Sequence, residues 1–428
     1  MNITITLRRQ FLLQFVLFIF WPFAAFADAN TAGYLTLSEA EQLALASDPV
    51  IAQFQAQAEA FSARAVAEGQ LPDPELSIGL AEVPLNNFDF GDHEDTELRL
   101  GLSQAFPPGQ TLRLRGERMG SMADAEQARV MNQRMLVLSE VRNAYVELYY
   151  QQEAARKLEL NRDLFSEMVE LTEHQYAQGR DNQHDIMRAQ LELSLIESRI
   201  EETRGAIAVA RAELAKWVTA THAARPLAAE FPAIPEPPES ETLIAQLPGH
   251  PLLSVEDAVI AATQKSVAIA HEQYKPQWML DFMVSDNTAS DFDLQTGPDF
   301  AGVMLKMSLP IFTGKRQDRQ LAASEQEAMA ARYGRADRLR ELTRLAEGEY
   351  ANLARLERQL ELYRSRAVVE AGQTQEAVFN AYQNDLADFE TLVRTRVLAL
   401  ETELEMLRLR SGCAKSRVNL LYLGGEQS

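Results

Sequence analysis

Histidine and cysteine are the side chains of this 428-residue chain most able to mark a metal or nucleophilic site. The six histidines stand at positions 93, 174, 184, 222, 250 and 271. None has a second histidine or a cysteine at ligand spacing on one helix face. His174 and His184 flank a polar turn, where we expect solvated side chains; the alternative is a weak site for a soft cation. We therefore predict no catalytic, cofactor or metal site, and no enzyme.

No nucleotide-binding loop is found, so energy for any driven process must come from a partner. Acidic residues outnumber basic ones by 62 to 41, and the formal net charge is -21. Such a balance repels phosphate backbones, so we expect no nucleic-acid partner.

Two polar turns hold the other candidate residues. The stretch QYAQGRDNQHDIMRAQ (175–190) resembles AYQNDLADFETLVRTR (381–396). Tyr176 matches Tyr382 in the two stretches, 206 residues apart, and Arg188 matches Arg394. Each turn lies between two segments with helical periodicity, so each is predicted to join a pair of helices.

Two further pairs of segments repeat at nearly the same offset. LSQAFPPGQ (102–110) aligns with MSLPIFTGK (307–315), and QLPDPELSIGL (70–80) aligns with YKPQWMLDFMV (274–284). Three matches in order predict an internal duplication. We place the first repeat at 28–221 and the second at 252–428. The linker between them, 222–251, holds seven of the 17 prolines, which favours an extended, semi-rigid connection.

The chain begins with features of a secretory signal peptide, predicted over residues 1–27. Arg8 and Arg9 precede an apolar run, and AFA ends at Ala27 as a cleavage site before Asp28. The alternative is an uncleaved anchor helix. No cysteine follows the run, which excludes a lipoprotein, and a single cysteine, Cys413, allows no internal disulfide. After Ala27 no stretch reaches the ~18 apolar residues of a spanning helix.

Four segments alternate between apolar and polar residues and are predicted as strands, at about 75–83, 97–106, 277–285 and 300–310. Leu76, Ile78 and Leu80, for example, oppose Ser77 and Gly79. Arg99, Asp281 and Lys306 fall on the polar face, where they suit a wet lumen better than a core. Lengths of about 9–11 residues suit a tilted membrane crossing. The alternative is a soluble sheet packed on helices. Four strands cannot close a barrel, which needs about eight, so oligomerisation is expected.

Each repeat also predicts a helix ahead of its strands, near 36–70 in the first repeat, and two long helices after them. The long helices are expected at about 110–178 and 182–220, and at about 315–382 and 386–420. The first is close to 100 Å long at ~1.5 Å per residue. Coiled-coil seams are predicted by steps of three and four residues through these positions: Val141, Tyr145, Leu148; Leu193, Ile196, Ile200; Leu353, Leu356, Leu360, Tyr363, Ala367.

The signal peptide, the duplicated halves, LPDPELSIG, LSQAFPPGQ and the Tyr-x-x-Gly turn from Tyr176 to Asp185 together resemble the TolC family of outer membrane efflux proteins. The resemblance covers essentially the whole mature chain, and LPDPELSIG with FPPG resembles the heavy-metal efflux branch. It implies a mixed, mainly α fold in which long coiled-coil hairpins carry four strands per subunit, and a homotrimer closes one 12-stranded outer-membrane β-barrel.

The resemblance also implies partners and sites. The helices extend into the periplasm as a tunnel, and their tips meet a membrane fusion (adaptor) protein of an inner-membrane pump. The tip residues implied to dock or gate are Tyr176, Gly179, Asp181, Asp185, Arg188, Tyr382, Asp385, Asp388, Thr391 and Arg394. The family often has acidic residues nine and twelve positions after the second tip tyrosine, but Thr391 and Arg394 stand there. Asp385, Asp388 and Glu390 lie close by and are a hypothetical source of negative charge.

The expected function is a passive duct in a tripartite efflux system, located in the outer membrane and in contact with its lipid. Metal cations, small organic toxins and secreted polypeptides are all open as cargo. The alternative is an exported periplasmic coiled-coil scaffold or adaptor with no channel. The strands discriminate between the two, because a scaffold has no need of strands with an apolar outer face.

Overall fold

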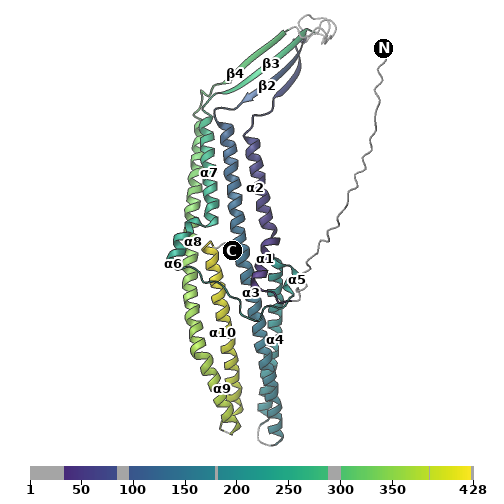
Figure 1. Ribbon diagram of the computed structural model, residues 1–428, viewed down its shortest axis with the longest axis vertical. Coiled ribbons are helices and arrows are strands. Elements are labelled where there is room, and N and C mark those ends of the chain that lie inside the picture. The colour runs from purple at the N-terminus through teal and green to yellow at the C-terminus, as the bar shows by residue number, and fades with distance from the viewer. Residues whose placement is uncertain (1–32, 84–95, 179–181, 288–299, 385, 426–428) are drawn as a thin grey trace, which may run out of the picture.

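The computed structural model describes residues 33–83, 96–178, 182–287, 300–384 and 386–425. The molecule is strongly elongated, with a four-stranded sheet at one end and, at the other, the turns that join the long helices in pairs (Figure 1). The signal peptide expected at 1–27 lies outside the described residues. Among the helices of the described segments, none is both long and apolar enough to cross a membrane.

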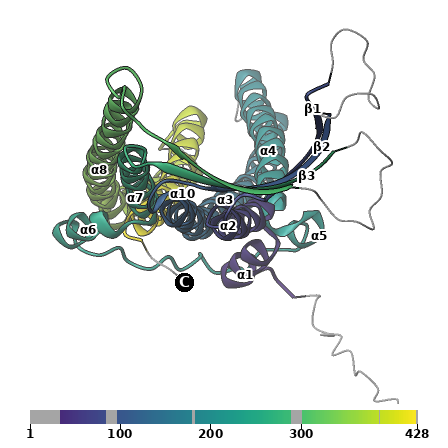
Figure 2. The same ribbon diagram turned by 90° about the horizontal axis from the view of Figure 1, so that it is seen from above.

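The sheet consists of β1 (Glu75–Ala81), β2 (Glu97–Phe106), β3 (Gln277–Asn287) and β4 (Phe300–Ser308), in the order β1-β2-β3-β4. All three pairings are antiparallel. The two outer pairings join strands of the same repeat, and β2–β3 joins the two repeats. Seen from above, the sheet is a curved strip, with α1 (Leu37–Ser47), α5 (Ala220–Ala223) and α6 (Ser240–Gln246) on its convex side (Figure 2).

The register brings the apolar positions of all four strands onto one face. Leu76 lies opposite Leu102, Phe282 opposite Val303, and Leu102 opposite Phe282. The face carries Leu76, Ile78, Leu80, Leu98, Leu100, Leu102, Trp278, Leu280, Phe282, Val284, Val303, Leu305 and Met307. Most of these side chains are exposed, Ile78 by 69% and Val303 by 71%, so the helices do not cover this face.

Short helices lead into each half of the sheet. The single helix expected near 36–70 is in fact two, α1 (Leu37–Ser47) and α2 (Pro49–Glu68). The break falls at Asp48, because a residue before proline is pushed out of the α conformation. The Asp48 carboxylate then caps α2 by accepting from the Ile51 N–H at 2.8 Å. Helix α7 (Pro251–Glu272) occupies the equivalent place before β3.

The junction between β2 and the next helix requires a glycine. Gly109 has a φ of +55°, and a Cβ there would lie 1.7 Å from Glu272 Oε2. That carboxylate instead accepts a 2.7 Å hydrogen bond from the Gln110 N–H, at the start of α3. The ammonium of Lys275 and this hydrogen bond lower the pKa of Glu272. An acid at a helix N-terminus is favoured by the helix dipole.

The first long hairpin consists of α3 (Thr111–Ala177) and α4 (Gln183–Val218). The second consists of α8 (Gln317–Leu362), a π-helical turn η2 (Tyr363–Ala367), α9 (Val368–Gln383) and α10 (Phe389–Leu423). Its first arm begins and ends 206 residues after α3 does. We expected an uninterrupted helix here, and the π turn departs from that. From Tyr363 the half-buried positions of this helix are four residues apart, at 363, 367, 371 and 375. The π turn accommodates one extra residue, which keeps these positions on the side of the helix that faces the seam.

The segment between the repeats is less extended than its prolines suggested. It contains α5 (Ala220–Ala223), α6 (Ser240–Gln246) and the 3-10 turn η1 (Leu247–Gly249). Leu227 forms a parallel bridge with Leu35, and the Leu35 N–H donates to the Pro226 carbonyl at 2.8 Å. Backbone pairing to the first repeat thus holds this segment against the helices.

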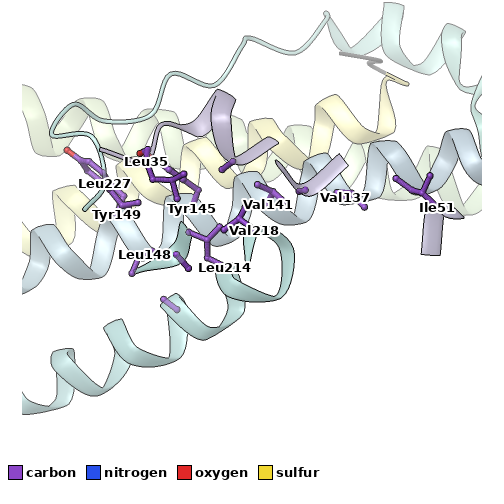
Figure 3. Packing of buried hydrophobic residues seen from close by; sticks show 14 of the residues in the cluster. Leu35, Ile51, Val137, Val141, Tyr145, Leu148, Tyr149, Leu214, Val218 and Leu227 are labelled. Carbon is purple, nitrogen blue, oxygen red and sulfur yellow. The ribbon is translucent and has the colours of Figure 1, made fainter. Parts of the chain in front are cut away.

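Three hydrophobic clusters hold the helices together. The first packs α1, α2, α3 and α4 with the connecting segment, around Tyr145, Leu148 and Leu214 (Figure 3). The Tyr145 hydroxyl donates to the Leu35 carbonyl at 2.7 Å. The second cluster joins α6, α7, α8 and α10, and includes Leu353. The third joins both hairpins near their turns, around Phe165. The predicted seam residues in these clusters are buried or half-buried, which confirms the coiled-coil pattern.

Candidate functional site

The polar face of the sheet is one candidate site. Arg99 lies there beside two acids, with Nε 3.0 Å from Glu97 Oε2 and Nη2 3.6 Å from Glu82 Oε1. Asp281 lies between Lys306, whose Nζ is 3.0 Å from Oδ2, and Ser103, whose hydroxyl donates to Oδ1. The three charged residues singled out from the sequence thus share a face, but they belong to two separate ion-paired groups. Paired charges suit a hydrated wall rather than acid–base catalysis.

Methionines on this face were missed by the sequence reasoning. Met304 lies opposite Asp281, and Met283 opposite Gly302, so both point to the polar side. They line, with Asp281, a small hollow of about 220 Å³. Their positions in the alternating pattern are the signal that would have found them.

The turn between α3 and α4, which we call the first tip, lies at the far end of the molecule from the sheet (Figure 1). Asp185 is the third residue of α4, and its Oδ2 accepts from the Asn182 N–H at 3.2 Å. Its other oxygen, Oδ1, lies 3.2 Å from His184 Nε2. Asp185 therefore stabilises the start of α4. Tyr176 is 47% exposed.

The turn between α9 and α10, the second tip, is built differently. Tyr382 is only 8% exposed, and its ring packs on Phe389 with centroids 6.0 Å apart. Asp388 caps α10, with Oδ1 accepting from the Thr391 N–H at 2.8 Å. The hydrogen bonds that Thr391 provides lower the pKa of Asp388. The Thr391 side chain is exposed. Gly179, Asp181 and Asp385 lie outside the described residues.

Two polar contacts join the tips. The Tyr382 hydroxyl donates to Gln175 Oε1 at 2.7 Å. Glu390 Oε1 contacts two arginines. Arg188 of the first hairpin lies with its Nη1 3.5 Å from this oxygen, and Arg394, on the same helix as Glu390, lies with its Nη2 3.2 Å from it. Each arginine therefore has an acidic partner, and the two share a single carboxylate. We call these contacts, made by Gln175, Arg188, Tyr382, Glu390 and Arg394, the tip clasp.

The partner of each clasp residue was not readable from local sequence. Gln175 and Tyr382 are 207 positions apart, and neither stands in a motif that specifies the other. Glu390 was noted only as a nearby acid. Within the described residues, no group of three or more His, Cys, Asp or Glu side chains is placed to hold a metal ion.

Solved structures with this architecture are outer membrane channels. The outer membrane protein VceC of Vibrio cholerae superposes with a TM-score of 0.77 at 19% identity, covering 91% of this chain and 96% of that one. CusC superposes with a TM-score of 0.78 at 16% sequence identity, and the match covers 92% of each chain. The open MtrE channel of Neisseria gonorrhoeae superposes with a TM-score of 0.72 at 15% sequence identity, covering 91% of this chain and 88% of that one. No family model and no curated protein sequence matches the chain. At these identities the likeness establishes the fold, and the fold expected from the TolC resemblance is confirmed.

Proposed function

We propose that this chain is the outer membrane component of a tripartite efflux system, a passive trimeric duct that conducts substrates from an inner-membrane pump across the periplasm and the outer membrane. The observation that carries the proposal is the two-faced sheet. Its apolar face is exposed on a chain with abundant charged residues, and a bilayer is the environment in which such a face is stable.

The sheet also has two edges to satisfy. β1 and β4 are its outer strands, and unpaired strand edges do not persist in a bilayer. Pairing of β4 with β1 of the next copy closes a ring of three chains, and three sets of four strands make a 12-stranded barrel. In that ring Arg99, Asp281 and Lys306 line the lumen, and the leucine-rich face meets lipid.

The hairpins supply the rest of the duct. They extend from the sheet to the tips, which places the tips in the periplasm, where an adaptor protein of the pump meets them. We propose that the tip clasp holds the periplasmic end closed, and that docking of the adaptor separates the hairpins. Contacts of this kind suit a gate, because exposed ion pairs and single hydrogen bonds each contribute only about 0.2–1.5 kcal/mol.

The proposed cargo includes metal cations. Glu390 offsets Arg188 and Arg394 at the tip, and Asp388 adds a further negative charge beside them. A cation therefore does not face a ring of free arginines. Small organic toxins and polypeptides are the competing cargoes, which the partner pump selects.

The test is fractionation of the expressed protein, followed by gel migration in detergent with and without heating. The expected result is a trimer in the outer membrane that dissociates on heating. A soluble periplasmic monomer would contradict the proposal and support the coiled-coil scaffold instead.

A matched pair of variants sharpens this test. Ile78→Lys places a charge on the apolar face, and Ser77→Lys places the same charge on the polar face one residue away. A lysine facing lipid near the midplane costs about 2–4 kcal/mol, so Ile78→Lys should reduce trimer yield and Ser77→Lys should not. Equal yields would show that lipid does not cover the apolar face.

A further inference from the structure

A cleft between the hairpins is not used by the proposed duct or its clasp. It lies beside the third hydrophobic cluster, where α3, α9 and α10 meet, and has a volume of about 450 Å³. Leu164 and Leu171 of α3 line one side, two helical turns apart, and Phe379 of α9 and Phe389 of α10 line the other. The lining residues belong to α3, α9 and α10 of this chain.

One cation stands in this apolar lining. Arg396 of α10 lines the cleft, and its Nε is shielded from solvent and has no hydrogen-bond partner. Burial lowers the pKa of the Arg396 guanidinium, and the negative charge of Glu403 acts in the opposite direction without a hydrogen bond to it. An arginine stays charged at any physiological pH. Buried guanidinium N–H groups are normally paired, because desolvation without a partner is costly. Arg188 Nε is likewise shielded and without a partner, but Arg188 Nη1 reaches Glu390, as Arg394 Nη2 does.

Glu167 is the one acid among the described residues that line the cleft. Its side chain is exposed, and no ion pair joins it to Arg396 in the described part of the chain. The cleft therefore presents an apolar wall, a shielded positive charge and an acid that faces water. This combination favours a ligand that carries one negative charge on an otherwise apolar molecule.

We propose that the cleft binds a small organic anion with an aromatic or aliphatic body, such as an aromatic carboxylate or sulfonate. Its volume falls in the range of about 300–1,000 Å³ typical of small-molecule sites. The body packs on the leucine and phenylalanine side chains. The anionic group engages the edge of the guanidinium through Nε and one Nη after a rotation of the side chain, which pairs the orphaned N–H.

The experiment is calorimetric titration of the full-length protein in lipid nanodiscs with naphthalene-2-sulfonate, and with 2-naphthol as the neutral analogue. We expect one sulfonate per chain and at least about 10-fold weaker binding in Arg396→Gln, since a charge-assisted hydrogen bond is worth that much. Arg396→Lys should retain part of the affinity. 2-Naphthol should bind more weakly and respond little to either change.

The matched control is Arg162→Gln, which removes a more exposed arginine of α3 paired with Asp163. It should leave binding unchanged, and heat-sensitive oligomers in all variants would show that folding is intact. Absence of sulfonate binding up to millimolar concentration would overturn the proposal. So would sulfonate binding that Arg396→Gln does not weaken, or that 2-naphthol matches.

The nanodisc preparation and the oligomer control rest on the proposed function. A heat-sensitive oligomer that does not bind the sulfonate would overturn the cleft proposal and leave the duct proposal standing, so the two failures are distinguishable.

Discussion

The two tips lie at matching positions of the predicted repeats, yet they are built in different ways. Tyr176 of the first tip is about half exposed, whereas Tyr382 of the second is buried against Phe389. Helix α3 reaches the first tip without interruption, whereas a π turn interrupts the helix that leads to the second. The second tip also provides Glu390, which both Arg188 and Arg394 contact. The predicted repeats therefore share their architecture, whereas the buried tyrosine and the shared acid belong to the second hairpin.

The largest difference between the hairpins is expected when one residue is deleted from the first long helix of each, because only one of the two deletions should disrupt packing. Deletion of Glu159 turns the rest of α3 by ~100° and takes Phe165 and Thr172, both fully buried, out of the core. Deletion of Ser365 should convert η2 into ordinary helix, because a π turn is a helix with one residue inserted. We expect loss of oligomer in the first case and a folded protein in the second, measured by heat-sensitive oligomer yield and circular dichroism. Equal damage would contradict this account of the π turn.

Truncating the two matched tyrosines should destabilise the second tip much more than the first. Tyr382→Ala removes a buried ring and its hydrogen bond to Gln175, at a cost of about 3–5 kcal/mol. Tyr176→Ala should cost about 0.5 kcal/mol or less, because its side chain is half exposed. Hydrogen exchange at the ends of α9 and α10 would report the difference. Similar protection in both variants would show that the burial of Tyr382 stabilises nothing.

The shared acid can be removed without changing shape. Glu390→Gln leaves Arg188 and Arg394 without their common partner, a loss of about 0.2–1 kcal/mol for each exposed pair. If the clasp closes the duct, conductance in planar bilayers should rise. His184→Gln is the control, because His184 occupies the equivalent place in the first tip. A rise in both variants, or in neither, would contradict the gating role of Glu390.

The smallest difference is a pH effect at the helix caps. Asp388 caps α10, and Asn182, which cannot titrate, begins α4 at the matching position. Because the folded-state pKa of Asp388 is below its ordinary 3.8, its cap is fully present above that value and is lost as pH falls through the lowered pKa. We expect hydrogen exchange at the start of α10 to accelerate below about pH 4 in the wild type. In Asp388→Asn that acceleration should be absent.

Much of the architecture was predictable because it is periodic. Alternation over two residues identified four strands and assigned Arg99, Asp281 and Lys306 to one face, where the register places them. Steps of three and four residues identified seams such as Val141 to Leu148, which the structure buries. The break at Asp48 was missed even though Pro49 is a local signal for it, since the flanking periodicity outweighed a single residue.

The candidate sites were only partly predictable. The sequence located both tips from their repeated residues, but it gave no partner for Arg188, Arg394 or Tyr382. Those partners are set by the crossing of two hairpins that are more than 200 positions apart. The cleft around Arg396 has the same origin, because its walls come from three helices.

What the sequence determined by itself is therefore local and repetitive: strand faces, coiled-coil seams and the near-equal halves. These follow from side-chain spacing, which each segment carries within itself. Only the tertiary structure decided how the halves meet, through the β2–β3 pairing, the clasp around Glu390 and the burial of Tyr382. Contacts between distant segments depend on the packing of whole helices, and no local pattern encodes which side chains that packing brings together.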